Sequence, residues 1–353
     1  HEGFVVFVPF VITGETVLAE IEEIHRQFAR AGLVEIIDPA TSRVEPQCPQ
    51  YTVCGGCQYQ HLAYDQQLVV KHKQVCDLFE RIGGQRPDRV RPVVACPTPY
   101  AYRNRIMVRT QFNRETRSMN VGYLRHQSRL VVDVESCPIA EPELNERLQD
   151  VRKDPPRKNG IKFTLRAMPE DWALPPDSFF QVNFHQLPQM IQVVAERLHS
   201  AGVQHLIDAY CGVGFFSLSL ADKVQRFTGV EVDKRAIEAA RKNAETMGHE
   251  NGTFIEGTTE DHIQDLVDAY DPSQTAVILD PPRKGCHPSI LEVLIQAKPK
   301  QIIYVSCHPA TLSRDIKTLC ESGCFEVHQI IPLDMFPQTQ HVECVTDIRL
   351  KQS

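Results

Sequence analysis

Residues 205–217 read His-Leu-Ile-Asp-Ala-Tyr-Cys-Gly-Val-Gly-Phe-Phe-Ser, and they predict the architecture of the C-terminal half of this 353-residue chain. An apolar run leads into two glycines, a pattern typical of a strand, a tight turn and the first turn of a helix. Ser217 stands where the third glycine of a dinucleotide-binding fingerprint would be. We therefore expect a nucleoside-type ligand at Gly212 and Gly214 rather than a pyrophosphate dinucleotide.

Short β-rich runs alternate with helical runs on both sides of this turn. Strands are predicted at 204–209, 226–231, 253–256, 275–279 and 301–305, and helices at 214–223, 234–247, 288–297 and 310–321. This alternation predicts a parallel, doubly wound α/β sheet. The runs at 325–333 and 342–350 predict an antiparallel pair of strands at its edge.

Two acids follow predicted strands of this sheet. Glu231 ends the next strand after the glycine turn, where a carboxylate can accept hydrogen bonds from both ribose hydroxyls. Asp280 begins the stretch Asp-Pro-Pro-Arg-Lys-Gly at 280–285. Glycines in a plain turn and an acid beside a helix start are the alternative, but the acid's spacing and the strand–helix context favour a cofactor site. The pattern resembles the S-adenosylmethionine site of class I methyltransferases.

A candidate nucleophile lies in residues 304–315, Tyr-Val-Ser-Cys-His-Pro-Ala-Thr-Leu-Ser-Arg-Asp. Cys307 follows a predicted strand and should lie near Asp280, where a helix starting near Ala310 could lower the pKa of its thiol. A buried, inert cysteine is the alternative. Glu343 sits where a polar loop enters an apolar strand, and its carboxylate could act as a general base.

A methyl donor combined with a cysteine nucleophile suits the methylation of carbon 5 of a pyrimidine. Carbon 5 of a pyrimidine is not nucleophilic enough to take a methyl group directly. A thiolate that adds at carbon 6 activates it, and a base must then remove the proton from carbon 5 before the thiolate can leave.

Length and composition limit the remaining possibilities. The chain is long enough for two or three domains, its net charge is −7, and no stretch predicts a membrane span or a secretory signal. Its 12 cysteines therefore favour metal binding or catalysis over a disulfide framework. We expect a cytoplasmic monomer.

Residues 101–130 form the most basic window of the chain, with a single acid, Glu115. Its arginines are Arg103, Arg105, Arg109, Arg114, Arg117, Arg125 and Arg129. An extended strand would place the first three on one face, opposite Ile106 and Val108. We expect Arg103, Arg105, Arg109 and Arg125 to bind RNA phosphates, although a solvated sheet face is the alternative.

The N-terminal region is predicted to hold a small antiparallel barrel at 3–45 or a simple β-hairpin cap, followed by a helix at 62–82. The run Arg-Lys-Asp-Pro-Pro-Arg-Lys-Asn-Gly at 152–160 is typical of a linker and suggests a boundary nearby.

The chain resembles the RNA uracil-5 methyltransferase family through six motifs in the same order. They are residues 179–183, 208–214, 229–231, 280–285, 306–315 and 341–343. The resemblance implies that Cys307 is the nucleophile and Glu343 the base that takes the proton. It also implies a cofactor and uracil pocket formed by Gln181, Tyr210, Gly212, Glu231 and Asp280.

The same resemblance extends to the N-terminal half. Residues 4–44 resemble a TRAM domain, which is an RNA-binding barrel. Four cysteines resemble the ligands of a [4Fe-4S] cluster, namely Cys48, Cys54, Cys57 and Cys137. Judged by residue type alone, four thiolates would suit a structural Zn²⁺ equally well.

These features predict three domains: a TRAM-like barrel at 1–47, a central cluster-binding and RNA-binding domain at 48–178, and a class I, Rossmann-like methyltransferase domain at 179–353. The helix at 62–82 is expected to pack on the C-terminal domain. Members of the family with a TRAM domain and a cluster act on 23S ribosomal RNA, which implies methylation of a uridine flipped out of that RNA. The alternatives are a tRNA uracil-5 methyltransferase, an exocyclic-amine methyltransferase and a non-catalytic RNA-binding protein. The step from Cys137 to residues 179–181 is short for the family and suggests a reduced central domain.

Overall fold

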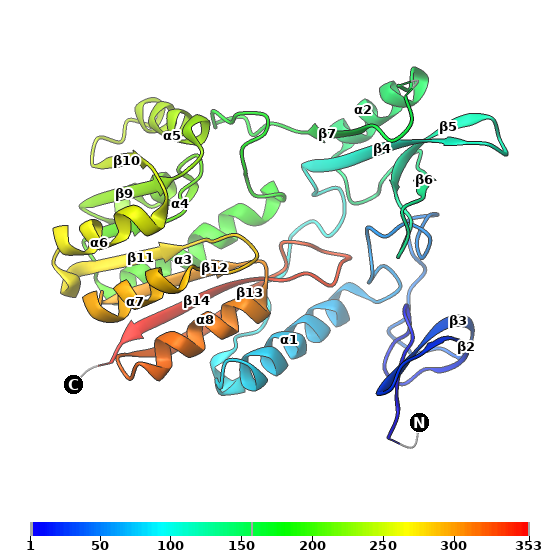
Figure 1. Cartoon of the computed structure of the whole chain (residues 1–353), viewed down its shortest axis with the longest axis horizontal. Coiled ribbons are helices and arrows are strands. Elements are labelled where there is room, and N and C mark those ends of the chain that lie inside the picture. The colour runs from blue at the N-terminus through cyan, green and yellow to red at the C-terminus, as the bar shows by residue number, and fades with distance from the viewer. Residues whose placement is uncertain (1–2, 157, 352–353) are drawn as a thin grey trace. The chain divides into compact units, whose positions relative to one another are not determined.

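A computed structural model describes residues 3–156 and 158–351 (Figure 1). Residue 157, inside the predicted linker, lies outside this description. The chain forms two compact units, which we describe separately. Unit 1 contains residues up to 67, 106–165 and 337–340, and unit 2 contains 68–105, 166–336 and the residues from 341 onward.

Unit 2 is built around a seven-stranded sheet with the order β10-β9-β8-β11-β12-β14-β13. Its strands are β8 His205–Asp208, β9 Arg226–Glu231, β10 Gly252–Glu256, β11 Thr275–Leu279, β12 Gln301–Ser306, β13 Phe325–Leu333 and β14 Glu343–Leu350. The first five pair in parallel, whereas β14 runs antiparallel to both β12 and β13. The predicted doubly wound sheet with an antiparallel pair is confirmed.

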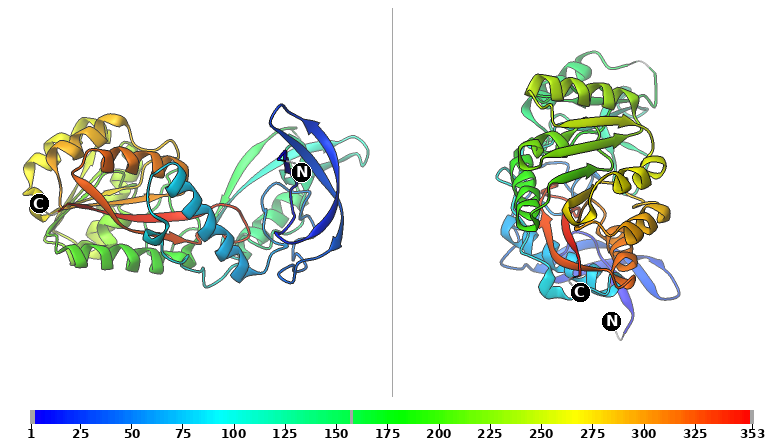
Figure 2. Two further views of the ribbon diagram at one scale, coloured as in Figure 1. Left: turned by 90° about the horizontal axis from the view of Figure 1, so that it is seen from below. Right: turned by 90° about the vertical axis from the view of Figure 1, so that its left-hand side faces the viewer.

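Helices cover both faces of this sheet (Figure 2). They are α1 Tyr64–Arg81, α3 Leu187–Ala201, α4 Phe215–Ser219, α5 Lys234–Met247, α6 Thr259–Ala269, α7 Pro288–Ala297 and α8 Pro309–Glu321. Along β11, Ala276 and Ile278 face one core with α3 to α5, while Val277 and Leu279 face another with α6 to α8. This period of two, with apolar residues on both faces, is typical of a buried parallel strand.

Two of these helices, α3 and α6, were not predicted. Helix α6 carries a recognisable start signal, because the side chain of Thr258 accepts a hydrogen bond from the backbone N–H of Asp261. Its buried Ile263, Leu266 and Val267 follow helical spacing. The signal was therefore present in the sequence.

Unit 1 contains two sheets. Strands β1 Val5–Phe7, β2 Thr16–Ile24 and β3 Phe28–Asp38 form one, and β4 Arg105–Asn113, β5 Ser118–Leu124, β6 Val131–Asp133 and β7 Lys162–Arg166 form the other. Helix α2 is Pro142–Lys153. The described residues of unit 2 also include short 3₁₀ helices at Pro87–Arg89, Phe184–Gln186, Ala221–Lys223 and Pro272–Gln274. The expected antiparallel pairing holds for β2 with β3, but β1 pairs with β3 in parallel.

The two compact units divide the chain differently from the three predicted domains, because each unit combines segments that are separated in the sequence. Most of α1 belongs to unit 2, where Val75 and Phe79 are fully buried in the core with α6 to α8. The central region is thus shared between the units.

In the described residues, no helix is both long enough and apolar enough to span a membrane.

Candidate functional site

The site of unit 2 lies at the carboxyl edge of its parallel strands, where ligands bind in open α/β sheets. Register pairs Asp208 with Gly229 on β9 and with Ile278 on β11, and pairs Leu279 with Tyr304 on β12. The residues that follow these strands therefore end at one edge. Every predicted catalytic and cofactor residue belongs to this unit.

The glycine turn after β8 has the conformation expected for close approach of a ligand. Gly212 and Gly214 have φ of 54° and 88°, in the left-handed region that favours glycine. A Cβ at Gly212 would meet no atom within 4 Å, so the space beside its backbone is open. A Cβ at Gly214 would lie 3.0 Å from both Leu218 and Phe254. The left-handed φ thus favours glycine at both positions, and the crowding adds a second reason at Gly214.

Ser217, at the place of the missing third glycine, anchors Asp208. Its backbone N–H and its hydroxyl both donate to Oδ2 of Asp208, at 3.0 and 2.6 Å. Burial raises the pKa of Asp208 to about 6. In the described part of the chain its other oxygen, Oδ1, is buried without a hydrogen-bond partner. Such an orphaned acceptor is a candidate to receive a donor or a positive charge from a ligand.

Glu231 is tied to the same turn. Its Oε2 accepts from the backbone N–H of Gly212 at 3.1 Å, and its Oε1 accepts from that of Asp233 at 2.9 Å. Each oxygen keeps a further lone pair for a ligand hydroxyl. The predicted link between the glycine turn and the acid at the end of β9 is thus present in the geometry.

Asp280 and Gln181 lie together. Nε2 of Gln181 donates to Oδ2 of Asp280 at 3.4 Å, and the backbone oxygen of Gln181 accepts from Asn104 at 2.8 Å. Burial, reinforced by the charge of Asp208, raises the pKa of Asp280 to about 8. The hydroxyl of Tyr210 instead interacts with Cys286 and Thr259, and burial raises its pKa.

Cys307 and Glu343 meet because of the antiparallel strand. Ser306 at the end of β12 pairs with Cys344 near the start of β14, so the next positions outward are Cys307 and Glu343. Burial raises the pKa of the Cys307 thiol to about 11, and the nearby carboxyl groups of Glu343 and Asp280 also raise it. Arg283 acts in the opposite direction through a hydrogen bond and its charge. A thiol, two carboxyls and a guanidinium therefore share one site.

Two expectations about this pair are wrong. The pKa of Cys307 is raised rather than lowered, because the thiol is largely buried and the carboxyls of Glu343 and Asp280 add negative charge. The start of α8 is capped by His308, whose Nδ1 accepts from the backbone N–H of Thr311 at 3.3 Å. Glu343 is not at a polar mouth, since it is only 3% exposed. Burial and Asp280 raise the pKa of Glu343 well above its usual value.

This electrostatic environment predicts a steep pH dependence for Cys307. Because the thiolate is the reactive form, alkylation of Cys307 by iodoacetamide should speed up about tenfold per pH unit between pH 7 and pH 10. Peptide mass spectrometry at each pH measures the rate. In Arg283→Met the same rise should shift to higher pH, because the group that lowers the pKa is gone. A plateau near pH 8 in the wild type contradicts this account.

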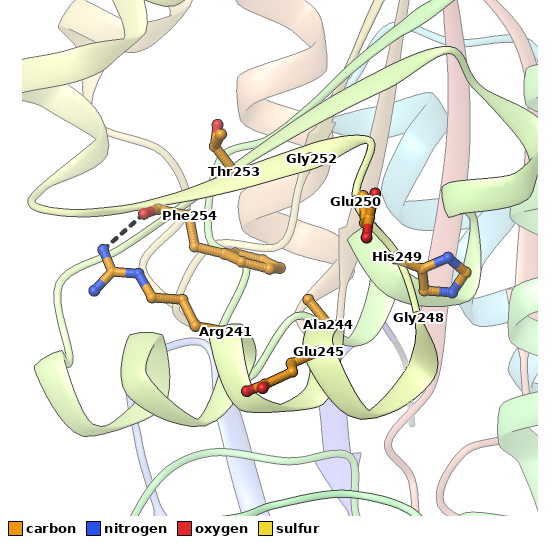
Figure 3. A pocket seen from close by; sticks show the side chains of 9 residues that line it. All are labelled: Arg241, Ala244, Glu245, Gly248, His249, Glu250, Gly252, Thr253 and Phe254. Carbon is orange, nitrogen blue, oxygen red and sulfur yellow. Dashed lines mark hydrogen bonds between the residues drawn. The ribbon is translucent and has the colours of Figure 1, made fainter.

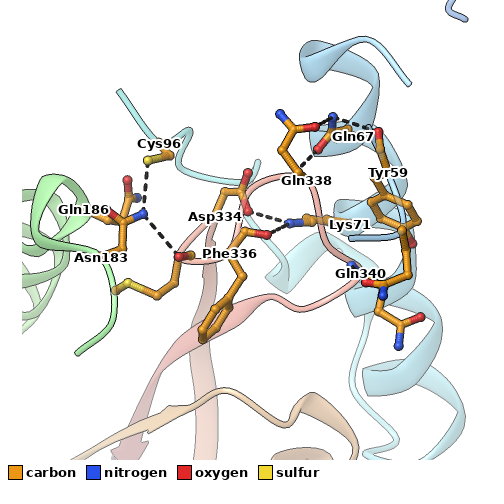
Figure 4. A network of polar contacts seen from close by, with 12 residues as sticks. Tyr59, Gln67, Lys71, Cys96, Asn183, Gln186, Asp334, Phe336, Gln338 and Gln340 are labelled. Atoms are coloured by element: carbon orange, nitrogen blue, oxygen red, sulfur yellow. Dashed lines mark hydrogen bonds and ion pairs between the residues drawn. The ribbon is translucent and has the colours of Figure 1, made fainter. Parts of the chain in front are cut away.

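A buried ion pair anchors the segment before Glu343. Lys71 and Asp334 are both fully buried, and Nζ of Lys71 lies 2.5 Å from Oδ1 of Asp334 and 3.0 Å from the backbone oxygen of Phe336 (Figure 4). Asn183 donates to the backbone oxygen of Met335 at 3.2 Å. These contacts hold residues 334–336, which lead from β13 toward Glu343. Nothing in the local sequence pattern marks a lysine of α1 for this role.

Replacing Lys71 with methionine should destabilise the protein by about 3–5 kcal/mol, because Asp334 would stay buried without its partner. Chemical denaturation followed by circular dichroism measures the change. Lys73→Met is the matched control: Lys73 lies on the same helix and forms an exposed pair with Asp77, so little change is expected. Equal stabilities of the two variants would show that the buried pair is not an anchor.

The four predicted RNA-binding arginines fall in both units. Arg103 and Arg105 belong to unit 2, whereas Arg109 and Arg125 belong to unit 1. The predicted alternation holds on β4, since Ile106 and Val108 are buried. Within the described residues, none of these four arginines forms an ion pair with a carboxylate. Their charges are therefore available to an anionic partner.

The four predicted ligand cysteines are gathered in unit 1. Burial raises the pKa of Cys54 to about 11 and that of Cys57 to about 12, and Cys48 and Cys137 raise both further through their charges. Across the described ranges, however, no three or more His, Cys, Asp or Glu side chains are arranged to hold a metal ion. The thiols are nevertheless near enough to influence one another's pKa.

A separate hollow of about 490 Å³ lies between the C-terminal end of α5 and the start of β10 (Figure 3). It is lined by residues of both charges, and Arg241 on its wall donates to the backbone oxygen of Phe254 at 2.8 Å. Since parallel strands share a direction, the start of β10 is at the opposite edge from Cys307. This hollow is not part of the catalytic site.

Comparisons with known proteins give matches to RNA methyltransferases. A family model described as tRNA (uracil-5-)-methyltransferase matches residues 171–351. An uncharacterized RNA methyltransferase of Thermosynechococcus vestitus is 30% identical over 419 aligned residues, covering 97% of this chain and 92% of that protein. One of Bacillus cereus is 31% identical and covers 98% and 91%.

Among solved structures, the Pyrococcus abyssi tRNA (uracil-54, C5)-methyltransferase in complex with S-adenosyl-L-homocysteine superposes with a TM-score of 0.74 at 25% identity. The match covers 97% of this chain and 95% of that one. The alignment to the Thermosynechococcus protein is 419 residues long, which exceeds the 353 residues of this chain. That relative therefore carries segments that this chain lacks.

Proposed function

Because this chain belongs to the tRNA (uracil-5-)-methyltransferase family, we propose that Cys307 and Glu343 carry out the methylation of carbon 5 of one specific uridine. The protein is an S-adenosylmethionine-dependent RNA uracil-5 methyltransferase, and unit 2 has the class I methyltransferase fold. The observation that carries the catalytic assignment is the thiol of Cys307 beside the buried Glu343, at the sheet edge that also holds the glycine turn.

The residues at the glycine turn fit S-adenosylmethionine. The open space beside Gly212 and the unpartnered Oδ1 of Asp208 suit a ligand that brings donors and positive charge. Gly212, Glu231, Asp280, Gln181 and Tyr210 would hold it. S-adenosylmethionine supplies the methyl group, bound to a sulfonium, that carbon 5 of uracil receives.

Cys307 begins the reaction as a thiolate that forms a bond to carbon 6 of uracil, and the electron pair of the 5,6 double bond moves toward carbon 5 and the carbonyl at carbon 4. Carbon 5 then accepts the methyl group. Glu343, as a carboxylate, takes the remaining proton from carbon 5, the double bond re-forms and the bond to sulfur breaks. Arg283 favours the charged forms of both Cys307 and Glu343.

A methylation assay tests this proposal. The purified protein, RNA and radiolabelled S-adenosylmethionine should yield 5-methyluridine, identified by nucleoside chromatography and mass spectrometry. Label in another nucleoside, such as an N-methylated adenosine, contradicts the proposed chemistry.

We propose 23S ribosomal RNA as the substrate, with the target uridine flipped into the site. The β-rich region at 3–45 and the four gathered cysteines support this choice, because the chain resembles family members that combine a TRAM domain with a cluster and act on that RNA. The Pyrococcus abyssi neighbour, which is named as a tRNA enzyme, makes tRNA the second candidate. Assays with unmodified 23S transcripts and unmodified tRNA transcripts in parallel distinguish the two.

We further propose that Cys48, Cys54, Cys57 and Cys137 hold a [4Fe-4S] cluster, for which their thiols would turn toward a common point. Their proximity supports this, since the charges of Cys48 and Cys137 raise the pKa of the other two. The cytoplasmic location and the monomeric state stay predictions.

Protein purified without oxygen should contain about four iron atoms per chain and show broad visible absorption, because four thiolates are the usual ligands of such a cluster. Iron analysis and an absorption spectrum measure this. Cys57→Ser should lose most of the iron, whereas Cys76→Ser, on α1, should keep it. A colourless protein that contains stoichiometric zinc contradicts the cluster.

A further inference from the structure

A small pocket in unit 1 is lined by side chains that offer donors but no carboxylate. Its volume is about 120 Å³, well below the 300–1,000 Å³ typical of sites for whole small molecules. Arg109 of β4 and Arg129 of the turn between β5 and β6 stand on its wall. The pocket therefore fits a compact anionic group rather than a nucleoside.

Two amide side chains of the wall are oriented by the sheet. Oε1 of Gln111 accepts from the backbone N–H of Val131 at 2.7 Å, and Oδ1 of Asn159 accepts from the backbone N–H of Phe112 at 3.0 Å. Because both amide oxygens accept hydrogen bonds from the backbone, the NH₂ groups of Gln111 and Asn159 are left as donors for a ligand. Neither NH₂ group donates to an acceptor within the described residues.

The arginines are similarly unengaged. In the described parts of the chain, neither Arg109 nor Arg129 forms an ion pair with an acid, although Arg152, elsewhere in unit 1, is paired with Asp133 at 2.7 Å. The hydroxyl of Thr110, also on the wall, donates to the backbone oxygen of Lys158 at 3.3 Å. A protein of net charge −7 thus keeps two unpaired guanidiniums beside two free amide donors.

We propose that this pocket, between Arg109 and Arg129, is a subsite for one backbone phosphate of the substrate RNA. The inference rests on the proposed function, which brings RNA to this protein. Guanidiniums match the geometry of phosphate oxygens, and neutral amide donors add hydrogen bonds without further charge. A phosphate contact of this kind positions the RNA and does not read its sequence.

Fluorescence anisotropy with labelled RNA, repeated over a series of salt concentrations, tests the subsite. Arg129→Gln should weaken binding about five- to tenfold at low salt and reduce the slope of log affinity against log salt by about 0.7–0.9. Arg109→Gln should do the same. Arg114→Gln, an exposed arginine of the same basic window outside the pocket, is the matched control and should leave the slope nearly unchanged. If all three variants lost RNA affinity equally, the arginines would act only through the overall positive charge of the basic window, and the proposal of a specific subsite would be overturned.

Inorganic phosphate distinguishes a free anion from an RNA phosphate as the occupant. At constant ionic strength, phosphate should weaken RNA binding by the wild type more than chloride does, and Arg129→Gln should lose this extra sensitivity. Phosphate binding that is lost in Arg129→Gln while the RNA affinity of that variant stays unchanged would overturn the RNA assignment.

The methylation assay separates this test from the proposed function. Arg129→Gln should also yield 5-methyluridine, with the KM for RNA raised by about the same five- to tenfold factor as the dissociation constant. If the wild type produces none, the proposed function fails. If the wild type is active and Arg129→Gln binds RNA as tightly as the wild type does, only the proposal of the phosphate subsite is rejected.

Discussion

Cys307→Ala should abolish both methylation and the covalent complex with RNA that carries 5-fluorouridine. Fluorine at carbon 5 cannot be removed as a proton, so the adduct between the enzyme and carbon 6 should persist in the wild type. Without the thiol no adduct can form, and the methylation rate should fall by roughly 10⁴-fold or more. Denaturing gel electrophoresis detects the adduct, and single-turnover kinetics with labelled methyl donor measures the rate.

The controls for this experiment are the other cysteines near the end of α8. Cys320→Ala and Cys324→Ala remove thiols that lie outside the site, and both variants should form the adduct as the wild type does. If either of these variants lost the adduct while Cys307→Ala kept it, Cys307 would not be the nucleophile.

Glu343→Gln should separate the first half of the reaction from the second. Glutamine keeps the shape of the side chain but cannot accept the proton from carbon 5. The thiolate can still attack and carbon 5 can still be methylated, so the enzyme should accumulate as a covalent complex with ordinary uridine RNA. Turnover should fall by about 10²–10⁴-fold, the usual contribution of a general base.

The same substitution tests the electrostatics of the site. Because Glu343 helps to raise the pKa of Cys307, its neutral replacement should lower that pKa and speed alkylation of Cys307 at pH 8. Glu326→Gln, which changes an exposed carboxylate on β13, is the matched control and should behave as the wild type. Normal turnover by Glu343→Gln would exclude Glu343 as the base.

Much of unit 2 could be predicted because its elements are marked locally. Apolar runs of period two, glycines at turns and capping residues all lie within a few positions of the element they define. Strand β9 and helix α5 have the predicted bounds, and Cys307 follows β12, which ends one residue later than predicted. The resemblance to a known family supplied what local patterns could not, namely the pairing of Cys307 with Glu343.

The parts that escaped prediction depend on residues far apart in the sequence. Lys71 and Asp334 are 263 positions apart, so their ion pair follows from the tertiary fold alone. The raised pKa of Cys307 has the same origin, because it follows from burial and from two carboxyls distant in the sequence, Glu343 on β14 and Asp280 after β11. In unit 1, the parallel pairing of β1 with β3 is likewise a long-range contact that no turn signal marks.

The most direct measurement of the central claim is peptide mapping of the wild-type adduct with 5-fluorouridine RNA. After digestion with protease and nuclease, mass spectrometry should find one modified peptide, with a methylated fluorouridine nucleotide attached to Cys307. A nucleotide attached to any other residue, or efficient formation of 5-methyluridine by an enzyme that never yields an adduct, would contradict the account.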